Sequence, residues 1–164
     1  MDGFLGIYLK DQFALGIAWR ELARRAAGNN KGTEAGAALA GVAADIAEDV
    51  ATFRNIMGKL NIRPDRVKNV AVTVAERVGR LKPNGRLLSY SPLSRFEELE
   101  FLIMGIEGKK QLWSTLRDLA GLGARLPDVD FDELIERAAK QRAELEPYRA
   151  NAGLEAFVTA SPDA

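Results

Sequence analysis

Three carboxylates stand close together in the stretch AADIAEDVATF, residues 43–53. Asp45, Glu48 and Asp49 fall within five positions of an otherwise apolar run. On a helix, Asp45 would lie one turn from both other acids, and Asp49 would border the apolar stripe through Ile46. Carboxylates that point into a bundle of helices can hold metal ions. Two interpretations follow, a metal site and a solvated or salt-bridged helix face.

Composition and motif spacing exclude several classes of chemistry. The 164 residues include no histidine and no cysteine, so histidine-dependent triads, thiolate catalysis, disulfides and the usual zinc sites are impossible. The pairs Gly58-Lys59 and Gly108-Lys109 lack the upstream glycine of a Walker loop. The stretch GNNKGT, residues 28–33, could cradle a phosphate, but connections between helices commonly have this composition. We therefore expect no cofactor.

The charge balance and the apolar runs bear on partners and location. The 23 basic and 23 acidic residues cancel, so we expect neither nucleic acid nor a membrane as partner. The apolar run at residues 101–106 is far shorter than the roughly 20 residues that a bilayer span needs. The first residues lack the positive region and cleavage site of an export signal. Together with the absence of cysteine, these features predict a cytoplasmic protein.

Apolar residues recur at steps of three and four along most of the chain, which is typical of helices. We expect five helical segments, at about residues 4–27, 33–60, 64–81, 92–120 and 131–146. The run VAVTV in the third segment would also suit a strand, but the helical spacing continues on both sides of it. Pro147 should stop or kink the fifth segment.

Helix starts are marked by residues that cap a first turn. Thr33 suits the N-cap of the second segment. Ser94 and Glu97 form a capping-box pattern inside the fourth segment, and Asp130 with Glu133 forms another before the fifth. These signals predict where each helix begins.

The segments together predict an all-α protein with one domain. Long amphipathic helices with short connections pack as an antiparallel bundle, so we expect a four-helix bundle with a shorter fifth helix over residues 1–150. Residues 151–164 should form a flexible tail. Trp113 continues the apolar stripe through Ile103 and Ile106, so it should be buried.

The order of the long helices resembles the ferritin-like superfamily over residues 4–147. The segments that carry this resemblance are LKDQFALGIAWREL, AADIAEDVATFRNIMGKL and FEELEFLIMGIEGKKQLWSTL. The resemblance implies a metal site with one Glu from each of two helices and a Glu-x-x-His from each of the other two.

The residues of this chain depart from that ligand pattern. The histidine-bearing motifs would fall on residues 45–48 and 107–110, where Glu48 and Lys110 stand in place of histidine. Lys110 would repel a metal and pair instead with a carboxylate of the second segment. We therefore expect no metal. If one binds, the candidate ligands are Asp45, Glu48, Asp49 and Glu107.

Local charge is uneven although the total is balanced. Residues 63–86 hold seven bases against two acids, and residues 128–155 hold eight acids against four bases. The basic side chains Arg66, Arg77 and Arg80 share one face of the third segment. They form either a solvated face or an interaction surface that meets the acidic region, in the same subunit or in a neighbour.

Three functions from different classes stay open. We favour a non-enzymatic, self-associating interaction protein, derived from a ferritin-like ancestor that lost its metal. A second is a bundle that binds a small apolar or anionic molecule on the fourth helix, at Phe96, Phe101, Leu102 and Met104 with neighbouring arginines. The third is an iron protein with an all-carboxylate site.

The uneven charge predicts a homodimer in which the basic face takes part. Replacing Arg77 and Arg80 by Glu should weaken association in sedimentation experiments and shift the free energy of unfolding by only about 0.5 kcal/mol. High salt should also weaken association of the wild-type dimer, because screening shortens the reach of exposed charges. A wild type that is monomeric at every concentration would contradict this prediction.

Overall fold

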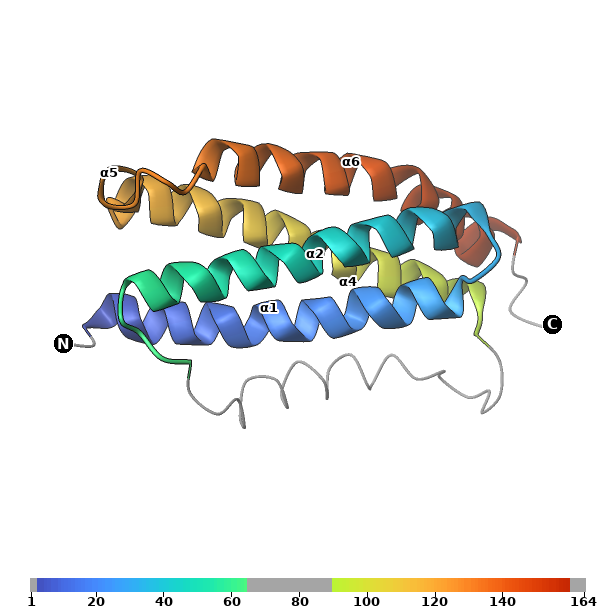
Figure 1. Cartoon of the computed structure of the whole chain (residues 1–164). Helices are drawn as coiled ribbons and strands as arrows, with labels where there is room; N and C mark the ends of the chain where they lie inside the picture. The colour runs from blue at the N-terminus through green and yellow to red at the C-terminus, as the bar shows by residue number, and fades with distance from the viewer. Residues whose placement is uncertain (1–2, 65–89, 160–164) are drawn as a thin grey trace.

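The computed structural model describes residues 3–64 and 90–159, and every regular element in these ranges is helical (Figure 1). The long helices are α1 (Phe4–Asn29), α2 (Glu34–Lys59), α4 (Pro92–Ser114) and α6 (Phe131–Leu154). Shorter elements are the π-helical turns η1 (Thr115–Leu119) and η2 (Glu155–Thr159) and the single turn α5 (Leu122–Arg125). The all-α prediction is confirmed for the described ranges. None of these helices has the length and apolar character that a membrane span requires.

Part of the predicted organisation lies outside the described residues. This holds for most of the third predicted helix and for its basic residues Arg66, Arg77 and Arg80. The predictions that depend on them, including the dimer, stay predictions.

Side-chain caps begin three of the long helices. The hydroxyl of Thr33 accepts from the backbone N–H of Gly36 at 3.0 Å, and the carboxylate of Asp130 accepts from that of Glu133 at 2.9 Å, as predicted. For α4 the predicted cap was wrong. Ser91 precedes the helix and accepts from the backbone N–H of Ser94 at 3.1 Å. Because Pro92 suits a first turn, the helix begins one residue after Ser91.

The turn between α1 and α2 is held by a close backbone approach. A Cβ at Gly36 would lie 2.0 Å from the carbonyl oxygen of Asn30, so only glycine fits. Asn30 is itself buried, and its side chain donates to the carbonyl of Ala26 at 2.9 Å and to the hydroxyl of Tyr90 at 2.9 Å. The turn therefore also contacts the residues that lead into α4.

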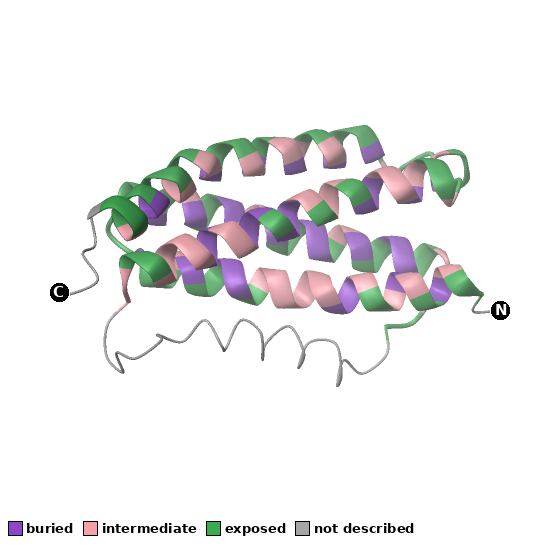
Figure 2. Ribbon diagram, turned by 180° about the vertical axis from the view of Figure 1, so that it is seen from behind, coloured by how far each residue is buried: buried purple, intermediate pink, exposed green. Residues whose placement is uncertain are grey.

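The long helices pack as two pairs. Helices α1 and α2 contact each other along their length, as do α4 and α6, while α1 also contacts α4 and α2 contacts α6. Buried faces of all four helices turn toward the interior (Figure 2). Trp113 is 1% exposed and packs against Phe53, so its predicted burial is confirmed.

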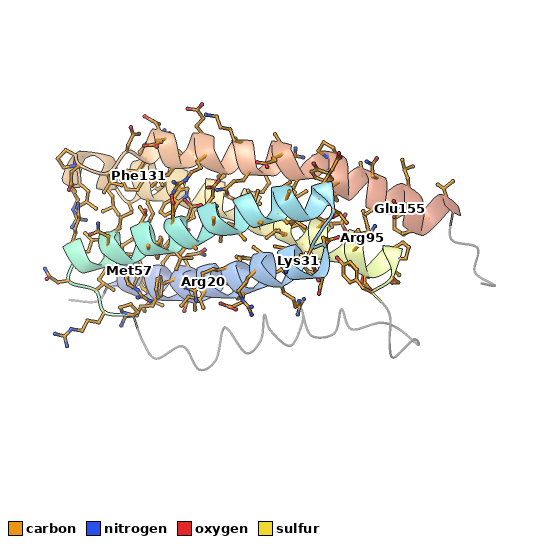
Figure 3. All side chains as sticks on the ribbon, turned by 45° about the vertical axis from the view of Figure 1, so that its right-hand side comes forward. Arg20, Lys31, Met57, Arg95, Phe131 and Glu155 are labelled. Carbon is orange, nitrogen blue, oxygen red and sulfur yellow. The ribbon has the colours of Figure 1, made fainter. Side chains whose placement is uncertain are left out.

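Helix α6 differs from the expected short fifth helix. It has 24 residues against 23 in α4, and it contains Pro147 within its length. The proline therefore does not end the helix. Beyond it, the ring of Phe157 meets that of Phe96 at a centroid distance of 5.0 Å. Arg95 donates to Glu155 at 3.1 Å. Figure 3 labels both Arg95 and Glu155.

Gly105 lets α4 approach α1 closely. A Cβ at this position would lie 2.5–2.8 Å from the indole ring atoms of Trp19. Gly41 offers a matched control, because it lies exposed inside α2 with nothing within 4 Å of its Cβ position.

We predict that Gly105→Ala and Gly41→Ala change stability in opposite directions. Gly105→Ala should destabilise by about 1–3 kcal/mol, since the Trp19 ring must move. Gly41→Ala should stabilise by about 0.5–1 kcal/mol through helix propensity alone. Urea unfolding of both variants measures the difference. Equal stabilisation by the two alanines would mean that the Trp19 contact does not constrain the helices.

Candidate functional site

Asp49 is the most buried acid of the described residues, at 2% exposure on α2. One of its oxygens accepts from Arg137 of α6. The other accepts from Lys109 of α4 and, at 3.4 Å, from the amide of Gln141 of α6. A single carboxylate therefore joins three helices, and both of its oxygens have donors.

Lys109 completes this polar cluster of Asp49, Lys109, Arg137 and Gln141. Its ammonium group also donates to the side-chain oxygen of Gln141 at 2.5 Å, and its side chain is only 14% exposed. Burial lowers the pKa of Lys109, because a charged ammonium loses hydration, while the charge of Asp49 acts in the opposite direction. For Arg137, burial also disfavours the charge, but the hydrogen bond and charge of Asp49 outweigh it and raise the pKa.

Two further acids of α2 surround the polar cluster. Glu48 is 71% exposed and accepts from Arg137 at 3.3 Å. Asp45 is half-buried and acts on Lys109 and Arg137 through its charge. Three acids thus stand beside two cations, so the surroundings offer no surplus of positive charge.

The structure separates the predicted metal candidates. Asp49 lies in the polar cluster, whereas Glu107 pairs near the surface with Lys110 at 3.3 Å and with Arg142 at 3.1 Å. Within residues 3–64 and 90–159, no three His, Cys, Asp or Glu side chains come close enough to ligate one metal ion. The predicted pairing of Lys110 with α2 was wrong, because the neighbouring Lys109 occupies the inward face of α4 and makes that contact.

A cavity of about 470 Å³ lies between α1, α2 and α4, beside the polar cluster. Aromatic side chains make up much of its wall, namely Tyr8, Phe13 and Trp19 of α1, Phe53 of α2 and Trp113 of α4. Both Asp49 and Lys109 also line it. The cavity therefore combines largely apolar walls with a few polar side chains, which also include Gln12, Gln111 and Thr115.

Three glycines belong to the lining of the cavity. Gly16, Gly105 and Gly108 all line it, and nothing lies within 4 Å of the Cβ position of Gly108. The lining of α1 extends from Tyr8 to Trp19, a distance of about 16 Å along a helix axis. The cavity is thus elongated along α1, and the exposed Gly108 lies where it reaches the surface of α4.

The residues predicted to bind an apolar ligand divide into two groups. Leu102 and Met104 line the cavity. Phe96 and Phe101 pack against the apolar core, and Phe96 also contacts Phe157. The guanidinium of Arg149 lies 5.7 Å from the ring centre of Phe96.

A second buried acid, Glu98, lies where α4 begins. It is 5% exposed and accepts from the amide of Asn29 at 3.2 Å, with Arg25 at 3.7 Å and the hydroxyl of Tyr90 at 3.5 Å. Burial raises the pKa of Glu98, and burial together with the charge of Glu98 raises the pKa of Tyr90 to about 12. These contacts fasten the start of α4 to the end of α1.

Sequence reasoning missed Arg137 and Gln141. A signal for Gln141 is present, because it interrupts the apolar stripe through Leu134, Ala138 and Leu145 on the buried face of α6. A polar side chain in such a stripe needs a hydrogen-bonding partner. That partner, on α2, is 92 residues distant in sequence.

Comparisons of the chain with protein-family models, with curated proteins and with solved structures find no match. The functional argument therefore rests on the polar cluster and the cavity.

We predict unequal effects of removing the two charges of the buried pair. Asp49→Asn should destabilise by about 3–5 kcal/mol, because it leaves the buried Lys109 without its ion-pair partner. Lys109→Met should destabilise the protein by less, since Asp49 keeps its ion pair with Arg137. The double variant should lose less free energy of unfolding than the sum of the two single losses. Urea unfolding at pH 7 gives all three values.

Lys110→Met is the matched control, because Lys110 pairs with Glu107 at a half-exposed position. It should shift the free energy of unfolding by at most about 1 kcal/mol. Equal effects of Lys109→Met and Lys110→Met would contradict the assigned burial of Lys109.

Proposed function

We propose that this protein binds a small, mostly apolar organic molecule in the cavity between α1, α2 and α4. The observation that carries the proposal is the cavity itself, about 470 Å³ with largely apolar walls and a few polar side chains, among them Asp49 and Lys109. Ligand pockets in proteins typically measure about 300–1,000 Å³ and combine apolar walls with a few fixed polar groups. Both properties are present.

The polar cluster supports a binding role because it holds the wall in place. Asp49 and Lys109 are connected to α6 by Arg137 and Gln141, so the polar region of the cavity cannot rearrange without breaking several hydrogen bonds. A wall that is fixed before binding reduces the entropy lost when a ligand binds.

We propose in addition that the helices form an antiparallel four-helix bundle related to the ferritin-like proteins. The packing of α1 with α2 and of α4 with α6 supports this arrangement. Asp49 pairs with Lys109 in the polar cluster, and the positive charge of Lys109 would repel a metal ion at this place. This pairing supports the proposed loss of a metal site. Self-association through Arg66, Arg77 and Arg80 stays a second proposal that the sequence alone supports.

The cavity should take up N-phenyl-1-naphthylamine, an uncharged fluorophore whose emission rises in apolar surroundings. We expect saturable binding by the wild type. Gly108→Leu should weaken this binding at least about tenfold, because the added side chain fills the cavity and displaces the dye.

Gly41→Leu is the control for this experiment. Gly41 is exposed on α2, has nothing within 4 Å of its Cβ position and does not line the cavity. Both leucines favour a helix over glycine, so neither should unfold the protein. Absence of saturable binding to the wild type, or equal affinity in both variants, would refute the proposed function.

A further inference from the structure

We infer that the molecule bound in the cavity is an elongated amphiphile, with its polar head near Gln12 and Thr115 and its apolar tail beside Trp19. The inference rests on the proposed function and adds the class of the ligand and its direction in the cavity. Its evidence is the uneven distribution of polar side chains along the lining.

Helices α1 and α4 run in opposite directions along the cavity (Figure 1). The ring of Trp19 on α1 lies against Gly105 of α4. Further along, Phe53 of α2 packs against both Phe13 of α1 and Trp113 of α4. Residue numbers thus fall along α1 while they rise along α4. The first part of the α1 lining therefore lies at the same end of the cavity as the last part of the α4 lining.

The lining of α4 changes from apolar to polar along the helix. Its first part consists of apolar residues and glycines, namely Leu102, Met104, Gly105, Ile106 and Gly108. Its second part contains the polar side chains of Lys109, Gln111 and Thr115. On α4 the polar lining is therefore at the end marked by Trp113.

The lining of α1 changes in the opposite order. Tyr8 and Gln12 come first, and Leu15, Gly16 and Trp19 follow. Because the two helices run in opposite directions, the polar parts of both linings meet at one end of the cavity. At the other end, the indole N–H of Trp19 is the only strong hydrogen-bonding side-chain group among the described lining residues.

Helix α2 has the same distribution. Ile46 lines the cavity one turn before Asp49, and Asp49 is paired with Lys109 of α4. This ion pair marks the boundary between the apolar and the polar part of the lining. Its two charges are opposite, so the charged side chains of the described lining favour neither a cationic nor an anionic head.

This arrangement gives a bound amphiphile a preferred direction. A polar head beside Leu102 and Ile106 would lose its hydration without gaining a hydrogen bond, which is unfavourable. Near Gln12 and Thr115, amide and hydroxyl side chains can both donate and accept. A few polar groups in an apolar pocket commonly fix the orientation of a ligand in this way. The α4 lining from Leu102 to Thr115 extends about 20 Å along the helix axis, which suits a linear chain.

Two isomeric alcohols test the direction of binding. In 10-bromodecan-1-ol the bromine is at the end of the tail, whereas in 2-bromodecan-1-ol it is beside the hydroxyl head. Displacement of N-phenyl-1-naphthylamine from the wild type first establishes that each alcohol binds in the cavity. Bromine quenches tryptophan fluorescence at close range, and both tryptophans of the protein line the cavity.

Each tryptophan reports on one end of the cavity. Trp19 lies against Gly105, and Trp113 follows Gly105 by about 12 Å along the axis of α4. Trp113→Phe leaves only the indole of Trp19, and Trp19→Phe leaves only that of Trp113. The two variants are matched controls for each other, because the same pair of alcohols is compared in both.

We expect the order of quenching to reverse between the variants. Because of the distance of about 12 Å, 10-bromodecan-1-ol should quench Trp19 at least about twofold more than its isomer does, and 2-bromodecan-1-ol should be the stronger quencher of Trp113. If Trp113→Phe does not fold, the quenching of Trp19 is obtained as the difference between the wild type and Trp19→Phe.

The possible outcomes separate the two proposals. If the wild type binds no dye, the proposed function fails. If both alcohols displace the dye but show the same order of quenching for both tryptophans, or if 2-bromodecan-1-ol is the stronger quencher of Trp19, the oriented amphiphile is overturned while the binding function stands.

Discussion

The burial of one carboxylate constrains the rest of the described structure. Asp49 is almost fully removed from water, and a buried charge is tolerated only when it is paired and hydrogen-bonded. Its donors come from two other helices, Lys109 from α4 and both Arg137 and Gln141 from α6. The rotation of each helix about its axis is therefore tied to the others, because turning any of them would leave a charge without a partner.

The cavity follows from the same arrangement. Lys109 links α4 to Asp49 of α2, while Gly105 allows the ring of Trp19 to approach the backbone of α4 closely. Gly108 is exposed, and none of the described residues lies within 4 Å of its Cβ position. Aromatic side chains of α1, α2 and α4 form much of the wall of this space. The polar cluster keeps one part of that wall hydrophilic.

Part of the site could be predicted from sequence because polar residues interrupt apolar stripes. Asp49 is a candidate from sequence because it stands close to two other acids and borders the apolar stripe through Ile46 and Phe53. Gln141 gives a similar signal in α6. The wrong choice of Lys110 over Lys109 shows the limit of such reasoning. Adjacent lysines differ by about 100° around a helix, and only the packing of α4 decides which one faces inward.

The sequence by itself determined that the described chain is helical, that Thr33 and Asp130 cap helices, and that Trp113 is buried. These features depend on residues a few positions apart, whose geometry a helix specifies locally. Only the tertiary structure decided that Arg137 would reach Asp49 across 88 residues of sequence and that the aromatic walls would leave a cavity. Both depend on how separate helices rotate and approach, which local periodicity does not encode.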